Sequence, residues 1–179
     1  MNIFVLSRDP LEAARMQCDK HVVKMIIETA QMLCTVGVGQ YKKTHINHPC
    51  TVWASKSLSN FNWLKIHGLE LCREYTYRYG KIHKSEDVII STLPADDMAD
   101  VGLTPFALAM PEEFKCDDPV EAYRLYYHTK RHFAKWTKRG VPAWWRNSEC
   151  VQQEYSADNA NIVFSELRRA MSVDKTTER

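Results

Sequence analysis

Residues 18–31 constrain this chain most, because they combine the composition of a buried helix with polar groups that such a helix should avoid. Six apolar side chains cover most of the helix surface: Val22, Val23, Ile26, Ile27, Ala30 and Leu33. The rest is a polar seam, which consists of Lys20, His21, Lys24, Glu28 and Gln31. We therefore expect a central helix whose polar seam faces a slot of solvent or a ligand. The alternative is an ordinary, partly exposed helix in which Lys24 and Glu28 form a weak ion pair.

The length and composition of the chain are those of one soluble globular domain. Its 179 residues are 45% apolar and 26% charged, and no apolar run reaches the roughly 20 residues of a membrane span. The apolar stretch 2–6 is too short for a signal peptide. Six scattered cysteines indicate reduced thiols in a cytoplasm rather than a disulfide scaffold. We expect one helical domain over 1–171 and a disordered tail over 172–179.

The helix signals predict a mainly α fold, a compact helical bundle with a short N-terminal extended segment at residues 3–6. Asp9 and Asp118 are each followed by Pro and, three residues on, by Glu, which is typical of helix starts. Asp19 is the predicted N-cap of the central helix, and Gly80 ends a long helical region. Helices are therefore expected after Asp9 and over 19–36, 50–79 with a break near 59–60, 118–138 and 157–171.

Charge is distributed unevenly along the second half of the chain. Residues 86–121 contain ten acidic residues and one lysine, whereas residues 122–148 contain seven Lys or Arg and no acidic residue. In this basic segment cations are interleaved with aromatic rings: Lys130, Arg131, Lys135, Trp136, Trp144, Trp145 and Arg146. Cations neutralise phosphates and flat rings stack on bases, so the pattern favours a nucleic-acid or nucleotide surface. Rings at helical spacing could equally be core, but consecutive tryptophans in an irregular segment rarely both point inward.

A second group of cations and phenols lies at the end of the long helical region. It consists of Arg73, Tyr77, Arg78 and Lys81. Cations at this position either contact phosphates or simply complement the negative end of the helix dipole.

Two short groups, Cys18 with His21 and His45 with His48 and Cys50, offer five possible ligands for a metal such as zinc. Their spacing matches no specific zinc pattern, and a packed cysteine beside a hydrogen-bonded histidine is the commoner arrangement. We therefore predict no metal and no other cofactor. A metal-dependent phosphohydrolase that uses this cluster remains an alternative.

Four segments resemble a family of small tailed-bacteriophage proteins: residues 1–6, residues 18–31, His45-Ile46-Asn47-His48-Pro49 and residues 74–81. More remotely, the first 84 residues resemble the pyrimidine-dimer DNA glycosylases of the endonuclease V type. The shared order is a short apolar N-terminus, a helix ending in an Ala-Gln-x-Leu-like turn, an Asn-His-Pro segment and a long helix ending in Glu-x-x-x-Arg-x-Gly. That family is a compact helical domain whose nucleophile is the N-terminal α-amine, assisted by a carboxylate from an early helix.

The second resemblance implies a DNA-repair glycosylase and lyase that acts on damaged pyrimidines. Its nucleophile would be the amine of Met1, because removal of Met1 is not expected before the large residue Asn2. The family's early helical Arg-Glu pair has no aligned counterpart, and Lys24 and Glu28 are the nearest substitutes. The predicted catalytic residues are Met1, Lys24, Glu28 and His21. His45, Asn47 and His48 join the predicted substrate-binding residues.

The expected partner is DNA or a nucleotide, with no membrane, and the sequence leaves the oligomeric state open. The same cations and rings would also suit a non-catalytic phage anti-defence protein that binds and sequesters a signalling nucleotide. If a phage encodes the chain, the expected compartment is the cytoplasm of the host cell.

Overall fold

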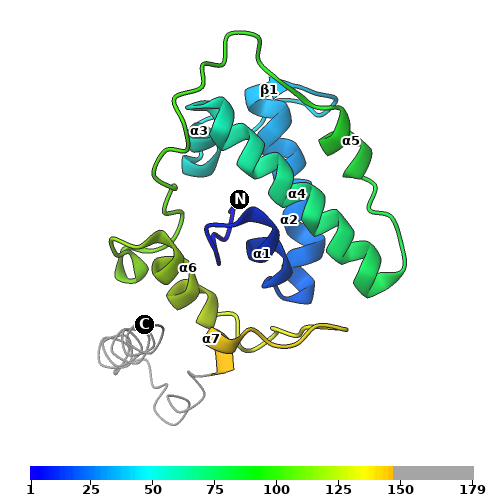
Figure 1. Cartoon of the computed structure of the whole chain (residues 1–179), viewed down its shortest axis with the longest axis vertical. Coiled ribbons are helices and arrows are strands. Elements are labelled where there is room, and N and C mark those ends of the chain that lie inside the picture. The colour runs from blue at the N-terminus through cyan, green and yellow to red at the C-terminus, as the bar shows by residue number, and fades with distance from the viewer. Residues whose placement is uncertain (147–179) are drawn as a thin grey trace.

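The computed structural model describes residues 1–146, and Figure 1 shows their arrangement. The helices are α1 (Pro10–Arg15), α2 (Asp19–Val36), α3 (Pro49–Ser55), α4 (Leu58–Tyr79), α5 (Glu86–Ser91), α6 (Pro119–His128) and α7 (Ala143–Arg146), with a 3₁₀ helix at Glu112–Phe114. Two short antiparallel strands, β1 (Gly37–Val38) and β2 (Leu93–Pro94), form a small sheet. The predicted mainly α fold is confirmed, whereas the predicted helix over 157–171 and tail over 172–179 lie outside the described residues. No helix within 1–146 is long and apolar enough to cross a membrane.

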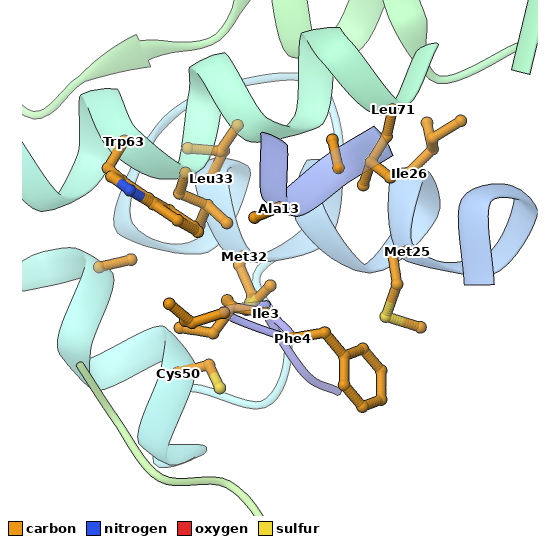
Figure 2. Close-up of a cluster of buried hydrophobic side chains, with 14 of the residues drawn as sticks. Ile3, Phe4, Ala13, Met25, Ile26, Met32, Leu33, Cys50, Trp63 and Leu71 are labelled. Carbon is orange, nitrogen blue, oxygen red and sulfur yellow. The ribbon is translucent and has the colours of Figure 1, made fainter. Parts of the chain in front are cut away.

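The centre of the molecule is the pair α2 and α4, and α1 packs on α4 (Figure 1). Gly68 of α4 permits this close approach, because a Cβ there would lie 2.5 Å from Cγ2 of Thr29. The N-terminal segment is buried beside α2, and Figure 2 shows Met25 and Met32 pointing from α2 toward it. This segment is irregular rather than a strand, since Phe4 has a positive φ of 38°.

The predicted Asp-Pro helix starts are confirmed. The side chain of Asp9 accepts hydrogen bonds from two backbone N–H groups in the first turn of α1, and Asp118 does the same for α6. Gly80 ends α4 in the left-handed conformation, at φ 67°, which glycine adopts without steric cost. The two caps and the glycine each depend only on the adjacent helical turn, and each lies at the helix end that the sequence predicts.

Two other predicted boundaries are wrong. Cys18, rather than Asp19, occupies the N-cap position of α2, and the Asp19 carboxylate instead accepts hydrogen bonds from Arg78 and Thr137. The break in the long helical region lies at residues 56–57 rather than at 59–60, because Ser57 caps α4 by accepting a hydrogen bond from its first turn. In both cases a side chain finds a partner that the helix pattern alone does not indicate.

The sixth helix, α6, is shorter than predicted. It ends at His128 and does not continue to Lys138. Residues 135–139 leave the helical path and reach α2, where the N–H of Asp19 donates to the carbonyl of Lys135 at 2.8 Å. Contacts across the bundle therefore override the helical preference of this segment.

The surface of α2 also differs from the prediction. Val23 and Ile27, which were expected to be buried, are 37% and 42% exposed. Two members of the polar seam, His21 and Glu28, point inward and are 7% and 9% exposed. The N-terminal segment packs on this inner face and supplies partners for both polar groups, so α2 is rotated relative to the expected orientation.

Candidate active site at the N-terminal amine

The N-terminal amine lies against a largely buried carboxylate. The amine nitrogen of Met1 is 3.8 Å from Oε2 of Glu28, and the N–H of Asn2 donates to the same oxygen at 3.0 Å. Nζ of Lys24 lies 3.4 Å from Oε1 of Glu28, and the Lys24 side chain is 70% exposed. Since Lys24 and Glu28 are one turn apart on α2, the helix brings this second cation to the carboxylate. Glu28 is thus shared between the α-amine and a lysine at the surface.

The first two residues are fixed rather than frayed. Nδ2 of Asn2 donates to the carbonyl of Ala109 at 2.8 Å, and Oδ1 of Asn2 accepts a hydrogen bond from the N–H of Phe4 at 2.9 Å. The Met1 side chain is 2% exposed, and its sulfur accepts a long hydrogen bond from Oγ1 of Thr51. Chain termini are usually mobile unless such contacts hold them. These contacts hold the amine in one place against Glu28.

His48 and Cys50 lie near the amine at the start of α3. Nδ1 of His48 accepts a hydrogen bond from the N–H of Cys50 and so caps this helix. The pKa of His48 is lowered from its ordinary value by burial and, secondly, by the positive charge of the N-terminal amine. Burial raises the pKa of the Cys50 thiol to about 12, so this cysteine is protonated at neutral pH. Of the amine and the Cys50 thiol, the amine is therefore the better candidate nucleophile, and Glu28 is the carboxylate beside it.

His21, the fourth predicted catalytic residue, lies in an aromatic cluster. Its ring stacks on Phe4 with 4.4 Å between centroids, and its Nδ1 is 2.8 Å from the hydroxyl of Tyr127. That hydroxyl also accepts a hydrogen bond from the N–H of Cys18. Burial, and then the charge of Lys130, lower the pKa of His21 to about 4. His21 is therefore neutral at pH 7 and holds the N-terminal segment against α2.

The Cys and His residues that could have formed a metal site do not assemble. Within residues 1–146, no three His, Cys, Asp or Glu side chains are grouped as metal ligands. His21 is bonded to Tyr127, His48 caps α3, and Cys50 carries a proton. The phosphohydrolase alternative therefore lacks the ligand set on which it depended.

Arg78, which was predicted to contact phosphate, is a structural residue. Its side chain has no solvent exposure, and all five of its N–H groups donate to protein oxygens. The acceptors are the carboxylates of Glu74 and Asp19 and the backbone carbonyls of Arg15 and Gln17. No donor is left for a ligand, which contradicts the predicted role. The cluster ties the end of α4 to the loop between α1 and α2.

The other members of this group remain at the surface. Arg73 is 71% exposed and pairs with Glu70. The hydroxyl of Tyr77 donates to the carbonyl of Lys138, which holds the crossing segment on α4. Lys81 lies past the end of α4 and lines a pocket that is separate from the amine. Of this group, the guanidinium of Arg73 and the ammonium of Lys81 remain where a phosphate could reach them.

The rings of the basic segment are largely packed inside. Trp145 is 6% exposed and stacks on His128 with 5.0 Å between centroids. Trp136 and Trp144 are half-buried, and their Nε1 groups donate to the backbone carbonyl and the sulfur of Met16, respectively. The expectation that the consecutive tryptophans point outward is wrong for Trp145, because the short helix α7 turns this ring onto α6. These rings stabilise the fold and are not free platforms for bases.

The cations of the basic segment are more accessible than its rings. Lys135 and Arg146 are exposed. Lys130 and Arg131 each lie over an aromatic ring, with 4.2 and 4.8 Å to the ring centres. Lys130 also acts on the pKa of His21, so the structure brings this part of the basic segment near the inner face of α2.

Two of the predicted binding residues lie in the exposed loop before α3. His45 and Asn47 are exposed, and His45 has a positive φ of 51°. The charge of His45 contributes to the lowered pKa of His48, which places this loop next to the amine. Asn2 and Thr51, which hold the amine, were not predicted as site residues. No motif marks them, because their role depends on contacts made after folding.

The comparison with known proteins agrees with this geometry. Residues 1–87 match the family model of pyrimidine dimer DNA glycosylases. The match covers just under half of the 179 residues, from the N-terminal amine to the end of α4 and slightly beyond. No curated protein and no solved structure matches the chain.

The predicted resemblance to the pyrimidine dimer glycosylases is thereby confirmed over these residues, and a DNA-repair glycosylase is supported at the level of the family. The matched region contains Met1, Lys24 and Glu28, whereas α6, α7 and the basic segment lie beyond it. The likeness to bacteriophage proteins stays a prediction.

Proposed function

We propose that this protein is a DNA glycosylase with lyase activity on damaged pyrimidines, and that the α-amine of Met1 is its nucleophile. The observation that carries the proposal is the 3.8 Å separation between this amine and Oε2 of Glu28. A fixed amine beside a carboxylate is the pair that imine chemistry needs, because the amine must lose a proton before it attacks. The family match over residues 1–87 points to the same chemistry.

The reaction can be written from these two groups. The amine nitrogen forms a bond to C1′ of the damaged nucleotide while the bond from C1′ to the base breaks, and the base leaves with the electron pair and takes up a proton. Glu28 accepts the proton that the amine releases. The bond from C1′ to the ring oxygen O4′ then breaks, Glu28 passes its proton to O4′, and the opened sugar is left as a Schiff base between Met1 and C1′. In the lyase step the Glu28 carboxylate takes a proton from C2′, a double bond forms between C2′ and C3′ as the bond from C3′ to the phosphate oxygen breaks, and water hydrolyses the imine to release the Met1 amine.

The surroundings of the amine suit DNA as the partner. Lys24 pairs with Glu28 but keeps its side chain 70% exposed, so its ammonium group can also meet a phosphate. Lys20 is exposed on the same helix. A damaged nucleotide inside a duplex must leave the stack to reach an enzyme's reactive group, and cations on the flanking phosphates hold the duplex while it does so.

Borohydride trapping on duplex DNA that contains a pyrimidine dimer tests the proposal. We expect reduction to link protein and DNA covalently, and the trapped peptide should begin with Met1. Lys24 is the only other amine within reach of Glu28 among the described residues, so Lys24→Ala should keep the adduct while weakening DNA binding. Glu28→Gln should abolish turnover and leave DNA affinity nearly unchanged, because the side chain keeps its volume and loses its proton acceptor.

Two controls make this test specific. A chain carrying Gly-Ser ahead of Met1 moves the free amine away from Glu28 and should not be trapped. Glu121→Gln makes the same chemical change at a partly exposed carboxylate on α6 and should be trapped like the unmodified protein. Absence of an adduct with every damaged substrate tried, or full trapping of the extended chain, would overturn the proposal.

A further inference from the structure

A pocket of about 820 Å³ lies beside the exposed side of α2, between the loop at 40–44 and the segment at 81–85 that follows α4. Its lining includes Lys42, Lys81, Lys84, Tyr41, Tyr75 and Ile27. None of the residues of the proposed catalytic pair lines it. We infer that this pocket binds a free nucleotide, with the phosphates on the lysines and the base against the apolar and aromatic wall. The inference does not depend on the glycosylase proposal.

The charge of the pocket calls for an anion. Three lysines converge on it from two segments that are far apart in the sequence, and no acidic side chain is among its lining residues. Like charges brought together repel one another unless a counter-charge binds between them. His83 adds a neutral donor, because its Nδ1 accepts a hydrogen bond from the N–H of Ser85 and its remaining N–H is at Nε2. Polyphosphate oxygens match this set of donors.

The rest of the lining calls for a flat, apolar group. Ile27 and Ile82 are 42% and 75% exposed, although isoleucine is usually buried. Tyr41 and Tyr75 contribute rings to the same pocket. A purely inorganic anion would leave this apolar surface in water, whereas a nucleobase would cover it. The combination of lysines with exposed isoleucines and tyrosines therefore favours a nucleotide over a simple phosphate.

Hydrogen bonds tie the two segments that bound the pocket to each other and to α2. The hydroxyls of Tyr41 and Ser85 are hydrogen-bonded at 2.9 Å, which joins the two loops across the pocket. Thr35 of α2 exchanges hydrogen bonds with the backbone of Thr44, at 3.0 and 3.1 Å, and fixes the other end of the first loop. The volume is that of a small-molecule site, and a pocket between two tied loops suits one nucleotide better than the continuous backbone of a duplex.

Isothermal titration calorimetry on the full chain tests the inference with ATP, CTP, GTP and UTP as probes. At least one of them should bind ten times more tightly than tripolyphosphate and ten times more tightly than its own nucleoside. Replacing both Lys42 and Lys84 with Ala should weaken nucleotide binding roughly tenfold or more, since each lost charge-assisted contact removes up to about a tenfold factor. Ile82→Ala should weaken the binding of the nucleotide but not the binding of tripolyphosphate. Lys56→Ala, at an exposed lysine outside the pocket, should change neither.

Three results would overturn the inference. Tripolyphosphate could bind as tightly as every nucleotide, which would show a general polyanion site. A second such result is that none of the four nucleotides binds. The third is that the double substitution of Lys42 and Lys84 weakens the binding of damaged duplex DNA and leaves nucleotide binding intact, which would assign the pocket to DNA binding. Borohydride trapping of the same double variant should equal that of the unmodified protein. Trapping therefore tests the glycosylase proposal, and calorimetry tests the nucleotide pocket independently of it.

Discussion

Arg78 offers the sharpest test of how the structure assigns roles to cations, because the sequence places it among phosphate contacts and the structure places it in the core. Arg78→Lys keeps the charge but replaces a fork of five N–H donors with an ammonium group that has three. At least two of the hydrogen bonds to Glu74, Asp19 and the carbonyls of Arg15 and Gln17 must then be lost. Each such bond to a charged group contributes about 1.5 kcal/mol or more.

The expected loss in the free energy of unfolding is therefore about 3 kcal/mol. For a chain of this length that corresponds to a melting temperature lower by roughly 6 to 12 °C. Urea denaturation followed by circular dichroism measures the first quantity, and calorimetry measures the second. Arg73→Lys is the matched control on the same helix: its side chain is 71% exposed, so we expect a change below about 0.5 kcal/mol.

A different outcome would refute the assignment. If Arg78→Lys left the stability within about 0.5 kcal/mol of the unmodified protein and weakened DNA binding instead, Arg78 would be a phosphate contact after all. The hydrogen bonds around Arg78 would then differ in the form of the protein that binds DNA. Binding to undamaged duplex, measured on the folded variant at low temperature, separates the two results.

Two further predictions concern pH and salt. His21 and His67 are buried with pKa values lowered to about 4, and His128 with a pKa lowered to about 3, so the unfolded chain takes up these protons first and stability is lost as the pH falls from about 6.5 toward 4. Each contributes about 3 kcal/mol to the free energy of unfolding over that range. Urea midpoints measured between pH 7 and 4.5 should show the loss. His132→Gln, at an exposed histidine, is the control and should leave the dependence of the midpoint on pH unchanged. Lys135→Ala should reduce the slope of log Kd against log salt on duplex DNA by about 0.9, because its side chain is exposed and only its backbone carbonyl contacts Asp19. An unchanged slope, with Lys56→Ala as the comparison, would show that Lys135 only solubilises the surface.

The parts of the fold that follow from neighbouring residues could be predicted from the sequence. Asp9 and Asp118 cap their helices, and Gly80 ends α4, since a cap or a left-handed glycine needs only the adjacent turn. The end of α6 could not be predicted. Whether the helix continues past His128 depends on what the crossing segment gains at α2, and that gain comes from Asp19, which is remote in the sequence.

The orientation of α2 shows the same limit. Its composition allows either the polar seam or the pair Val23 and Ile27 to face solvent, and hydrophobicity favours burying the isoleucine. The N-terminal segment reverses this preference, because it brings partners for His21 and Glu28 to the inner face. Ile27 is then left at the surface, where it lines the proposed nucleotide pocket.

The proposed active site depends on the part of the chain that the family match does not cover. The match ends at residue 87, yet Asn2 is held by the carbonyl of Ala109, and the carbonyl of Leu6 accepts a hydrogen bond from Arg124 of α6. The hydroxyl of Tyr127 fixes His21 from the same helix. These contacts keep the N-terminal segment against α2, and so they keep the amine near Glu28. The matched residues carry the proposed reacting groups, and contacts from the rest of the described chain help to hold the N-terminal segment in place.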